Sequence, residues 1–285
     1  MQSFNTQLTK LRQHFNTIAS QEREPNKEDW TTTCSLLEEI PAADLNIAVD
    51  YVLEHIEVWS AALREPPERW LETLCSGERE PRLRLCSLFR EPWPYTHTPA
   101  EIVQALCTHE LINVENIELN GHYDGAAGSN ILRAIASSPH LTKLHHLFLE
   151  CCDFDLDAFT FFAKSTRRLT NITLIQQTRL DLNAVLELFR TAPAFEEVTS
   201  IQYDHVGPPI SGEGLIALLD SPRGSQLTDL HLGEWPLMEG SPVPKWIYDH
   251  SAQLTNLQNL SIGQMYEEDW EIREDLSYRY EMSLE

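Results

Sequence analysis

The residue types best suited to chemistry gather in one short window, 141-LTKLHHLFLECCDFDLD-157. Two adjacent histidines, two adjacent cysteines and three aspartates lie within it, and side chains of these types hold zinc and other transition metals. A zinc ion keeps its ligand atoms at about 2.0–2.3 Å, so the ligands must converge on one point. The window therefore suggests either a metal site or a structural segment with polar residues in its exposed positions.

The leucines of this window indicate the element that would carry these side chains. They follow the string LxxLxL, which predicts a strand whose leucines point into a core. His145 and Cys151 are then six residues apart in extended chain, or about 20 Å, so they cannot share one ion within the strand. His146 and Phe148 lie two positions apart, and we expect them to share the outward face of the strand.

The LxxLxL string recurs along the second half of the chain, with aliphatic residues or, once, a tyrosine at its fixed positions. The first residues of successive strings are 30, 25, 29, 29 and 30 positions apart. A repeat of this size with one internal pattern is typical of a solenoid, in which each unit packs on its neighbours. The six strings are Val114-x-x-Ile117-x-Leu119, Leu144-x-x-Leu147-x-Leu149, Leu169-x-x-Ile172-x-Leu174, Val198-x-x-Ile201-x-Tyr203, Leu227-x-x-Leu230-x-Leu232 and Leu257-x-x-Leu260-x-Ile262.

Segments with helical spacing lie between the strings. Apolar residues at i, i+3, i+4 and i+7, such as Leu182, Val185, Leu186 and Phe189, form one buried stripe. A strand followed by a helix, repeated at similar lengths, predicts an α/β fold with parallel strands along one side and helices along the other. The predicted helical segments are 129-SNILRAIASSP, 155-DLDAFTFFAKS, 181-DLNAVLELFRTAP, 213-EGLIALLDSP and 243-VPKWIYDHSAQL.

These repeats resemble the leucine-rich repeat family, and the unit length is similar to the ribonuclease-inhibitor-like subtype with degenerate repeats. The resemblance covers residues 77–265, with six clear units from residue 111. It implies a horseshoe-shaped arc with parallel strands on the concave face and helices on the convex face, and protein binding through the concave face. The family usually carries Asn or Cys three residues after each string, and Cys152 alone fits, as a small buried residue at the bend. The residues in that column are His122, Cys152, Gln177, Val206, Trp235 and Met265.

One degenerate unit is expected over residues 80–110, before the clear repeats. Within it, 82-RLRLCSLF is predicted to be a strand. Thr98 and Glu101 have the spacing of a capping box, which predicts a helix from there through Leu106.

Residues 1–76 lack the string and show helical periodicity, which predicts an N-terminal all-α cap. Asn26 is expected to cap a helix over Lys27–Ile40. A purely structural role for such a unit is to cover the open edge of the repeat array, and a separate binding function is the alternative. One long apolar face is formed by Leu45, Val49, Val52, Leu53, Ile56 and Trp59.

Composition limits the choice of partners. The 285 residues are 42% hydrophobic, enough for a packed core, and 44 acidic residues against 21 basic ones give a formal net charge of −23. We therefore expect a basic protein partner and no nucleic acid, which needs a basic surface.

The chain contains no run of 18 apolar residues, so no membrane span is predicted. The beginning of the chain lacks a signal-peptide pattern and the six cysteines form no CxxC pair, so reduced thiols and a cytoplasmic location are expected. Residues 266–285 are expected to form an acidic C-terminal tail or cap.

The outward strand positions supply the candidate binding residues. Among 30 such positions in the six units, six are acidic, four are histidine and none is lysine or arginine. Phe148 and Ile175 are expected on adjacent strands, roughly 5 Å apart, as an apolar contact spot. The candidate partner-binding residues are Glu115, Glu118, His146, Phe148, Glu150, Ile175, Asp204, Asp229, His231 and Glu234.

The sequence thus predicts a non-catalytic protein-interaction module with an acidic concave surface, either an inhibitor or immunity-type protein or an adaptor. No nucleotide-binding, hydrolase or zinc-protease motif occurs, so neither an enzymatic activity nor a cofactor or metal is predicted. The alternative hypothesis is a metal-binding regulator or an enzyme that uses the strands around His145 and His146. Partner identity and oligomeric state stay open.

Overall fold

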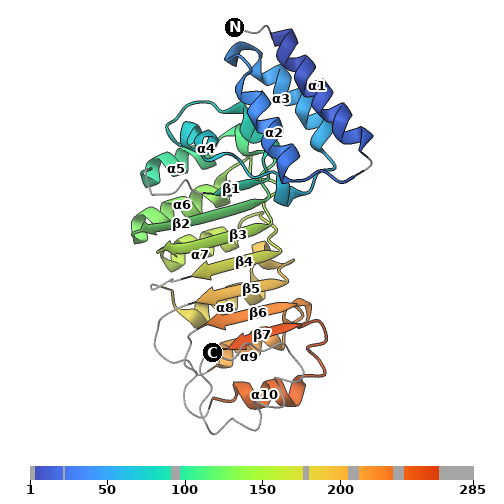
Figure 1. Ribbon diagram of the computed structural model, residues 1–285. Helices are drawn as coiled ribbons and strands as arrows, with labels where there is room; N and C mark the ends of the chain where they lie inside the picture. The colour runs from blue at the N-terminus through green and yellow to red at the C-terminus, as the bar shows by residue number, and fades with distance from the viewer. Residues whose placement is uncertain are drawn as a thin grey trace. The chain divides into compact units, whose positions relative to one another are not determined.

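The computed structural model describes residues 4–21, 23–90, 97–175, 180–204, 212–233 and 241–262 (Figure 1). The chain divides into two compact units: Met1–Ile117 with Ser138–Lys143, and Glu118–Ser137 with Leu144–Glu285. The predicted tail at 266–285 and the candidate residue Glu234 lie outside the described residues. The predicted boundary at residue 76 falls after α4, which ends at Cys75, and lies inside the first unit, which continues to Ile117.

The strands in the described part of the chain form one seven-stranded parallel sheet, and their order in the sheet is their order in the chain. The α/β class and the parallel strands are therefore confirmed, and the sheet is open rather than closed into a barrel. The strands are β1 Leu88–Arg90, β2 Asn116–Tyr123, β3 His146–Cys152, β4 Asn171–Ile175, β5 Ser200–Asp204, β6 Asp229–Gly233 and β7 Asn259–Ile262. The helices are α1 Phe4–Ser20, α2 Lys27–Glu38, α3 Leu45–Ile56, α4 Glu68–Cys75, α5 Pro99–Leu106, α6 Gly125–Ser137, α7 Leu156–Ala163, α8 Leu182–Thr191, α9 Glu213–Leu219 and α10 Val243–His250.

Local capping signals in the first unit give the predicted helix starts. Asn26 caps α2, and its side chain and that of Asp29 form a reciprocal capping box, although the helix ends two residues before the predicted Ile40. Thr98 and Glu101 form the predicted box at the start of α5. Such boxes satisfy amide groups that the first helical turn leaves without a partner.

The prediction of a strand over 82-RLRLCSLF is wrong for its first half. Residues Pro81–Leu85 form a 3₁₀ helix, and only Leu88–Arg90 joins the sheet. Proline at the first helical position and the Glu80 carboxylate, which accepts the Arg82 N–H, favour this turn. Because Leu83 and Leu85 are fully buried in it, their alternation resembled that of a strand.

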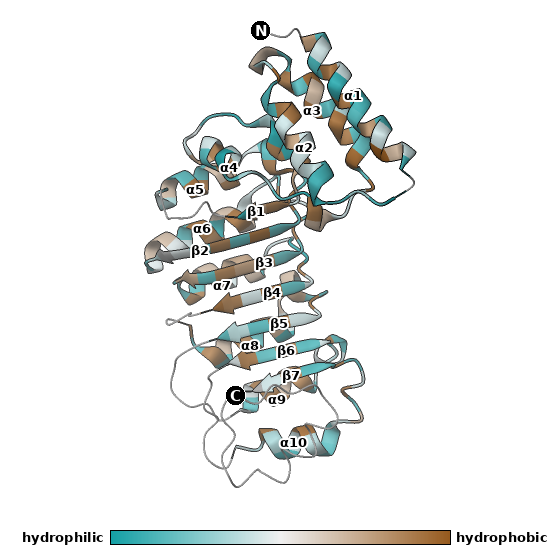
Figure 2. Cartoon of the chain, in the orientation of Figure 1, coloured by the Kyte–Doolittle hydropathy of each residue, from teal (hydrophilic) through white to brown (hydrophobic). Residues whose placement is uncertain are grey.

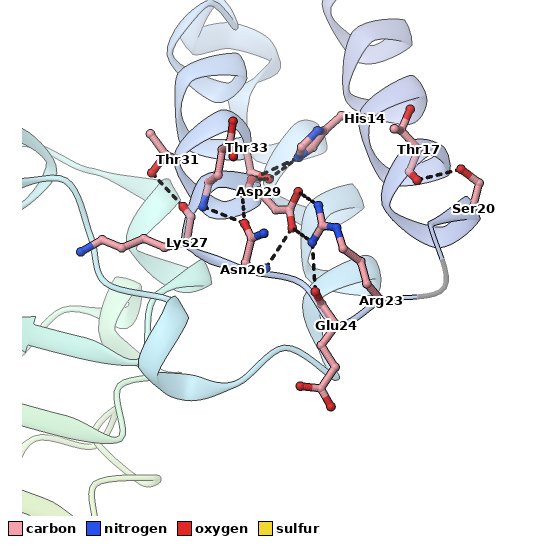
Figure 3. Close-up of polar contacts among 11 residues, drawn as sticks. His14, Thr17, Ser20, Arg23, Glu24, Asn26, Lys27, Asp29, Thr31 and Thr33 are labelled. Atoms are coloured by element: carbon pink, nitrogen blue, oxygen red, sulfur yellow. Dashed lines mark hydrogen bonds and ion pairs between the residues drawn. The ribbon is translucent and has the colours of Figure 1, made fainter.

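A polar cluster fixes the connection between α1 and α2 (Figure 3). The Arg23 guanidinium donates to both carboxylate oxygens of the buried Asp29, at 2.6 and 2.9 Å. His14 Nε2 lies 3.1 Å from the Asp29 carbonyl oxygen and 3.2 Å from Thr33 Oγ1. The Thr33 hydroxyl donates its single proton to that carbonyl, and a carbonyl oxygen can only accept. His14 Nε2 must therefore be the donor toward both oxygens. The Asp29 carboxylate points to Arg23 and the Asn26 N–H rather than to His14, so this cluster is not arranged as a catalytic triad.

The core of the second unit lies between the strands and helices α6 to α9. The fixed positions of the LxxLxL strings pair across the sheet, so that Leu147, Ile172, Ile201 and Leu230 form one row, and all four are almost fully buried. Hydrophilic and hydrophobic residues alternate along the first half of β2 (Figure 2), because successive side chains of a strand point to opposite faces. In Figure 1, α6, α7 and α8 lie behind the strands, on the side of the buried residues.

A ladder at the amino ends of the strands fixes the register of the repeats. The backbone N–H groups of Thr170, Thr199 and Thr228 each donate to the carbonyl oxygen one unit earlier, at 2.8 Å in all three cases. The Thr170 hydroxyl donates to the same carbonyl as its backbone, at 3.2 Å. These threonines occupy the second position of their strings. They align the strands at their amino ends. The bend column lies at the opposite ends, and the expected Asn or Cys residues are largely absent from it.

Candidate binding face of the sheet

The outward positions of β3 to β7 form a continuous face, which we call the strand face. Its residues lie in rows across the strands because the parallel register pairs equivalent positions. No lysine or arginine occupies any of these described positions. The strand face consists of His146, Phe148, Glu150, Asn171, Thr173, Ile175, Ser200, Gln202, Asp204, Asp229, His231, Gly233, Asn259 and Ser261.

Two of its carboxylates are oriented by neutral neighbours. The Asn120 amide donates to Glu150 at 2.5 Å. The Thr228 hydroxyl donates to Asp229 at 2.6 Å, and the Asn259 amide bonds to the same carboxylate. Neutral donors hold a carboxylate in place without cancelling its charge, so both groups keep a negative potential on the face.

Asp204 is held by the strand beside it. Its Oδ1 accepts the Gly233 N–H at 3.0 Å and lies 3.2 Å from His231 Nε2, and its Oδ2 accepts from the Gln202 amide at 3.4 Å. The charge of this carboxylate is therefore partly offset whenever His231 is protonated.

The other predicted acidic residues have different surroundings. Glu115 lies in the first unit, one residue before β2, and forms a 3.2 Å ion pair with Arg64. This pair reduces the contribution of Glu115 to an acidic surface, and the sequence offered no signal for it because the partners are 51 residues apart. Burial lowers the pKa of His146, and the negative charge of the nearby Glu118 opposes this effect.

The two apolar candidates are diagonal neighbours rather than a directly opposed pair. Phe148 pairs with Thr173, whereas Ile175 pairs with Glu150. A strand spacing of about 4.8 Å and a shift of two residues along the strand separate their Cα atoms by about 8 Å. The expected 5 Å separation was wrong because the two residues occupy the fifth and seventh positions of their strings.

Cys152 has a structural role within the window that suggested a metal site. The buried Cys152 lies at the bend, with its Sγ 3.3 Å from the Glu150 carbonyl and 3.7 Å from that of Leu119. Burial, followed by the nearby Glu150 and Asp153 charges, raises the pKa of the Cys151 thiol. Within the described ranges, no three His, Cys, Asp or Glu side chains are grouped so that they could hold a metal ion.

The first unit contains a pocket of about 500 Å³ between α2 and the segment that leads into α4. The Trp30 indole N–H donates to the Glu65 carbonyl at 2.6 Å, and Glu38 forms an ion pair with Arg69 at its edge. The sequence interpretation missed this pocket, because two segments about 35 residues apart form it. Its lining residues are Lys27, Trp30, Thr31, Cys34, Ser35, Glu38, Ala62, Leu63, Glu65, Pro66, Pro67, Glu68 and Arg69.

The fold is that of an α/β protein with an open parallel sheet. In its second unit, helices lie behind the strands. The described outward positions of these strands include acidic residues and no lysine or arginine. No protein-family model matches the chain, and no curated protein is significantly similar to it. In the part of the chain that the structure describes, no helix has both the length and the apolar character needed to cross a membrane.

Proposed function

We propose that the chain is a leucine-rich-repeat protein of the ribonuclease-inhibitor-like subtype that binds a basic protein partner through its strand face and catalyses no reaction. The repeated strand–helix units, the in-register rows and the buried LxxLxL positions support the family assignment. Under this proposal the strand face is the concave surface of the arc. An inhibitor of a basic enzyme and an adaptor are two versions of the same activity.

The observation that carries the proposal is the charge pattern of the strand face. Glu150, Asp204 and Asp229 present carboxylates on three strands, and their hydrogen-bond partners hold them without a lysine or arginine. A surface of one charge sign attracts a partner of the opposite sign and rejects partners of its own sign. Half-buried Phe148 and Ile175 add apolar area that a partner can remove from water, which stabilises a complex.

Affinity capture from a native lysate at low salt, followed by mass spectrometry, tests the proposal. We expect the wild-type chain to enrich a basic protein that a charge-neutral variant of the strand face fails to retain. A matched control removes three charges from the helical side and should retain the partner. Equal capture by all three proteins would count against the proposal, and metal in the purified protein would favour the metal-binding alternative. The test variant is Glu150→Gln, Asp204→Asn and Asp229→Asn, and the control is Glu187→Gln, Asp220→Asn and Asp249→Asn.

A further inference from the structure

We propose that the partner docks an amphipathic basic α-helix across the strands, with one apolar side chain on Ile175 and a basic side chain on each side of it. This inference rests on the proposed function and adds the conformation and the residue spacing of the partner segment. It follows from one row of the strand face.

The row at the carboxyl ends of the strands alternates acidic and apolar side chains. Glu150 pairs with Ile175, Ile175 with Asp204, and Asp204 with Gly233. Neighbouring strands lie about 4.8 Å apart, so Ile175 is midway between two carboxylates whose backbones are about 9.6 Å apart. A complementary ligand therefore presents basic, apolar and basic groups at intervals of about 5 Å.

An α-helix supplies this spacing on a single face. With a rise of about 1.5 Å per residue, side chains at i, i+3 or i+4, and i+7 lie about 5 and 10.5 Å along the axis. In an extended strand, side chains on one face repeat at about 6.6 Å, and in a polyproline helix at about 9.3 Å. Neither of these conformations places a third side chain midway between two that are 9.6 Å apart.

Residues beside this row complete the fit. Phe148, diagonal to Ile175, extends the apolar contact by about 6.6 Å along the strand direction, which lets the helix bury a second side chain. At the end of the row, Gly233 contributes no side chain and its N–H fixes the Asp204 carboxylate at 3.0 Å.

Gly233 also offers a way to test geometry separately from charge. A Cβ at this position would overlap Asp204 Oδ1 and lie 3.0 Å from His231 Nε2. Both contacts are with the ends of side chains, which can rotate away, so Gly233→Ala should leave the fold intact. The same substitution moves the Asp204 carboxylate while the net charge of the protein stays unchanged.

Three synthetic peptides of identical composition provide the test, with affinities measured by fluorescence anisotropy at low salt on the full chain. The first is a helix-forming peptide with lysine at i and i+7 and leucine at i+3 and i+4. The second has the same residues in scrambled order, and the third exchanges a flanking alanine and a terminal proline so that the proline interrupts the helix. We expect the first to bind at least about tenfold more tightly than the other two, because it alone can engage Ile175 and both flanking carboxylates at once.

Protein variants then locate the peptide. Ile175→Ala and Gly233→Ala should each weaken the first peptide by about fivefold to tenfold and leave the scrambled peptide unaffected. Asp220→Asn, which removes one exposed charge beyond the end of α9, should change neither affinity. Circular dichroism of each variant confirms that it is folded.

The outcomes separate the two proposals. Equal binding of all three peptides, abolished by neutralising Glu150 and Asp204, would overturn the helical inference and leave the proposed function standing. Binding of the first peptide that Ile175→Ala and Gly233→Ala do not weaken would also overturn the inference, because the helix would then lie elsewhere. Absence of binding by every peptide would contradict both.

Discussion

Gly128 of α6 offers a sharp test of how the helices pack behind the strands. The helix passes so close to the bend after β3 that a Cβ at Gly128 would overlap the backbone oxygen of Asp153. It would also lie 2.9 Å from the Asp153 carbonyl carbon and 3.3 Å from that of Cys152. Carbon atoms in contact prefer about 3.5–4.0 Å, so Gly128→Ala must displace backbone by several tenths of an ångström or more.

The size of the effect follows from two opposing contributions. Overpacking of this kind costs about 1–3 kcal/mol, whereas replacing glycine by alanine in a helix gains up to about 1 kcal/mol. We therefore expect Gly128→Ala to lower the free energy of unfolding by about 1–2 kcal/mol. For a unit of this size, each 1 kcal/mol lowers Tm by about 2–4 °C.

Gly214 of α9 is the matched control. Its Cβ would meet only side-chain atoms at close range, Asn183 Oδ1 at 2.9 Å and Leu186 Cδ1 at 3.4 Å, and these can rotate away. Gly214→Ala should therefore leave the free energy of unfolding unchanged or raise it by up to about 1 kcal/mol, the gain from replacing glycine in a helix. Urea unfolding followed by far-ultraviolet circular dichroism measures both variants. If Gly128→Ala proved as stable as wild type, the close approach of α6 to the bend would be refuted.

Three further predictions concern the first unit. Asn26→Ala removes the cap of α2 and should cost about 1 kcal/mol in urea unfolding, and an unchanged midpoint would contradict the capping role. The hydrogen bond from Arg23 holds the pKa of Asp29 below its usual range, so the stabilisation is present above about pH 4 and is lost as the pH falls through the lowered pKa. Thermal melts at decreasing pH should show this loss in wild type and a weaker dependence in Asp29→Asn. Burial raises the pKa of Cys34 to about 12, so iodoacetamide should modify the exposed Cys107 well before Cys34, as mass spectrometry of partly labelled protein can show.

Local signals explain why much of the architecture could be predicted from the sequence. The α5 start followed from Thr98 and Glu101 because a capping box involves residues only three positions apart. The parallel strands followed from the repeated string, since its period fixes both the buried positions and the helix between them. The 3₁₀ turn at Pro81–Leu85 was missed because two buried leucines in alternation fit a strand equally well.

The candidate site was less predictable because its electrostatics depend on contacts far apart in the chain. The string pattern gave the outward positions of Glu150, Asp204 and Asp229, but not the donors that orient them. Nothing local to Glu115 indicates that Arg64 neutralises it. The relative positions of Phe148 and Ile175, by contrast, could have been obtained from the alignment of the strings alone.

The most direct test of the account is a map of where the partner touches the chain. Zero-length carbodiimide cross-linking joins carboxylates to lysine amines that are in contact, and mass spectrometry identifies the linked pairs. With the captured basic partner, we predict cross-links at Glu150 and Asp229 of the strand face and none at Asp220 or Asp249 on the helical side. Cross-links confined to the helical side would contradict the claim that the acidic strand face is the binding surface.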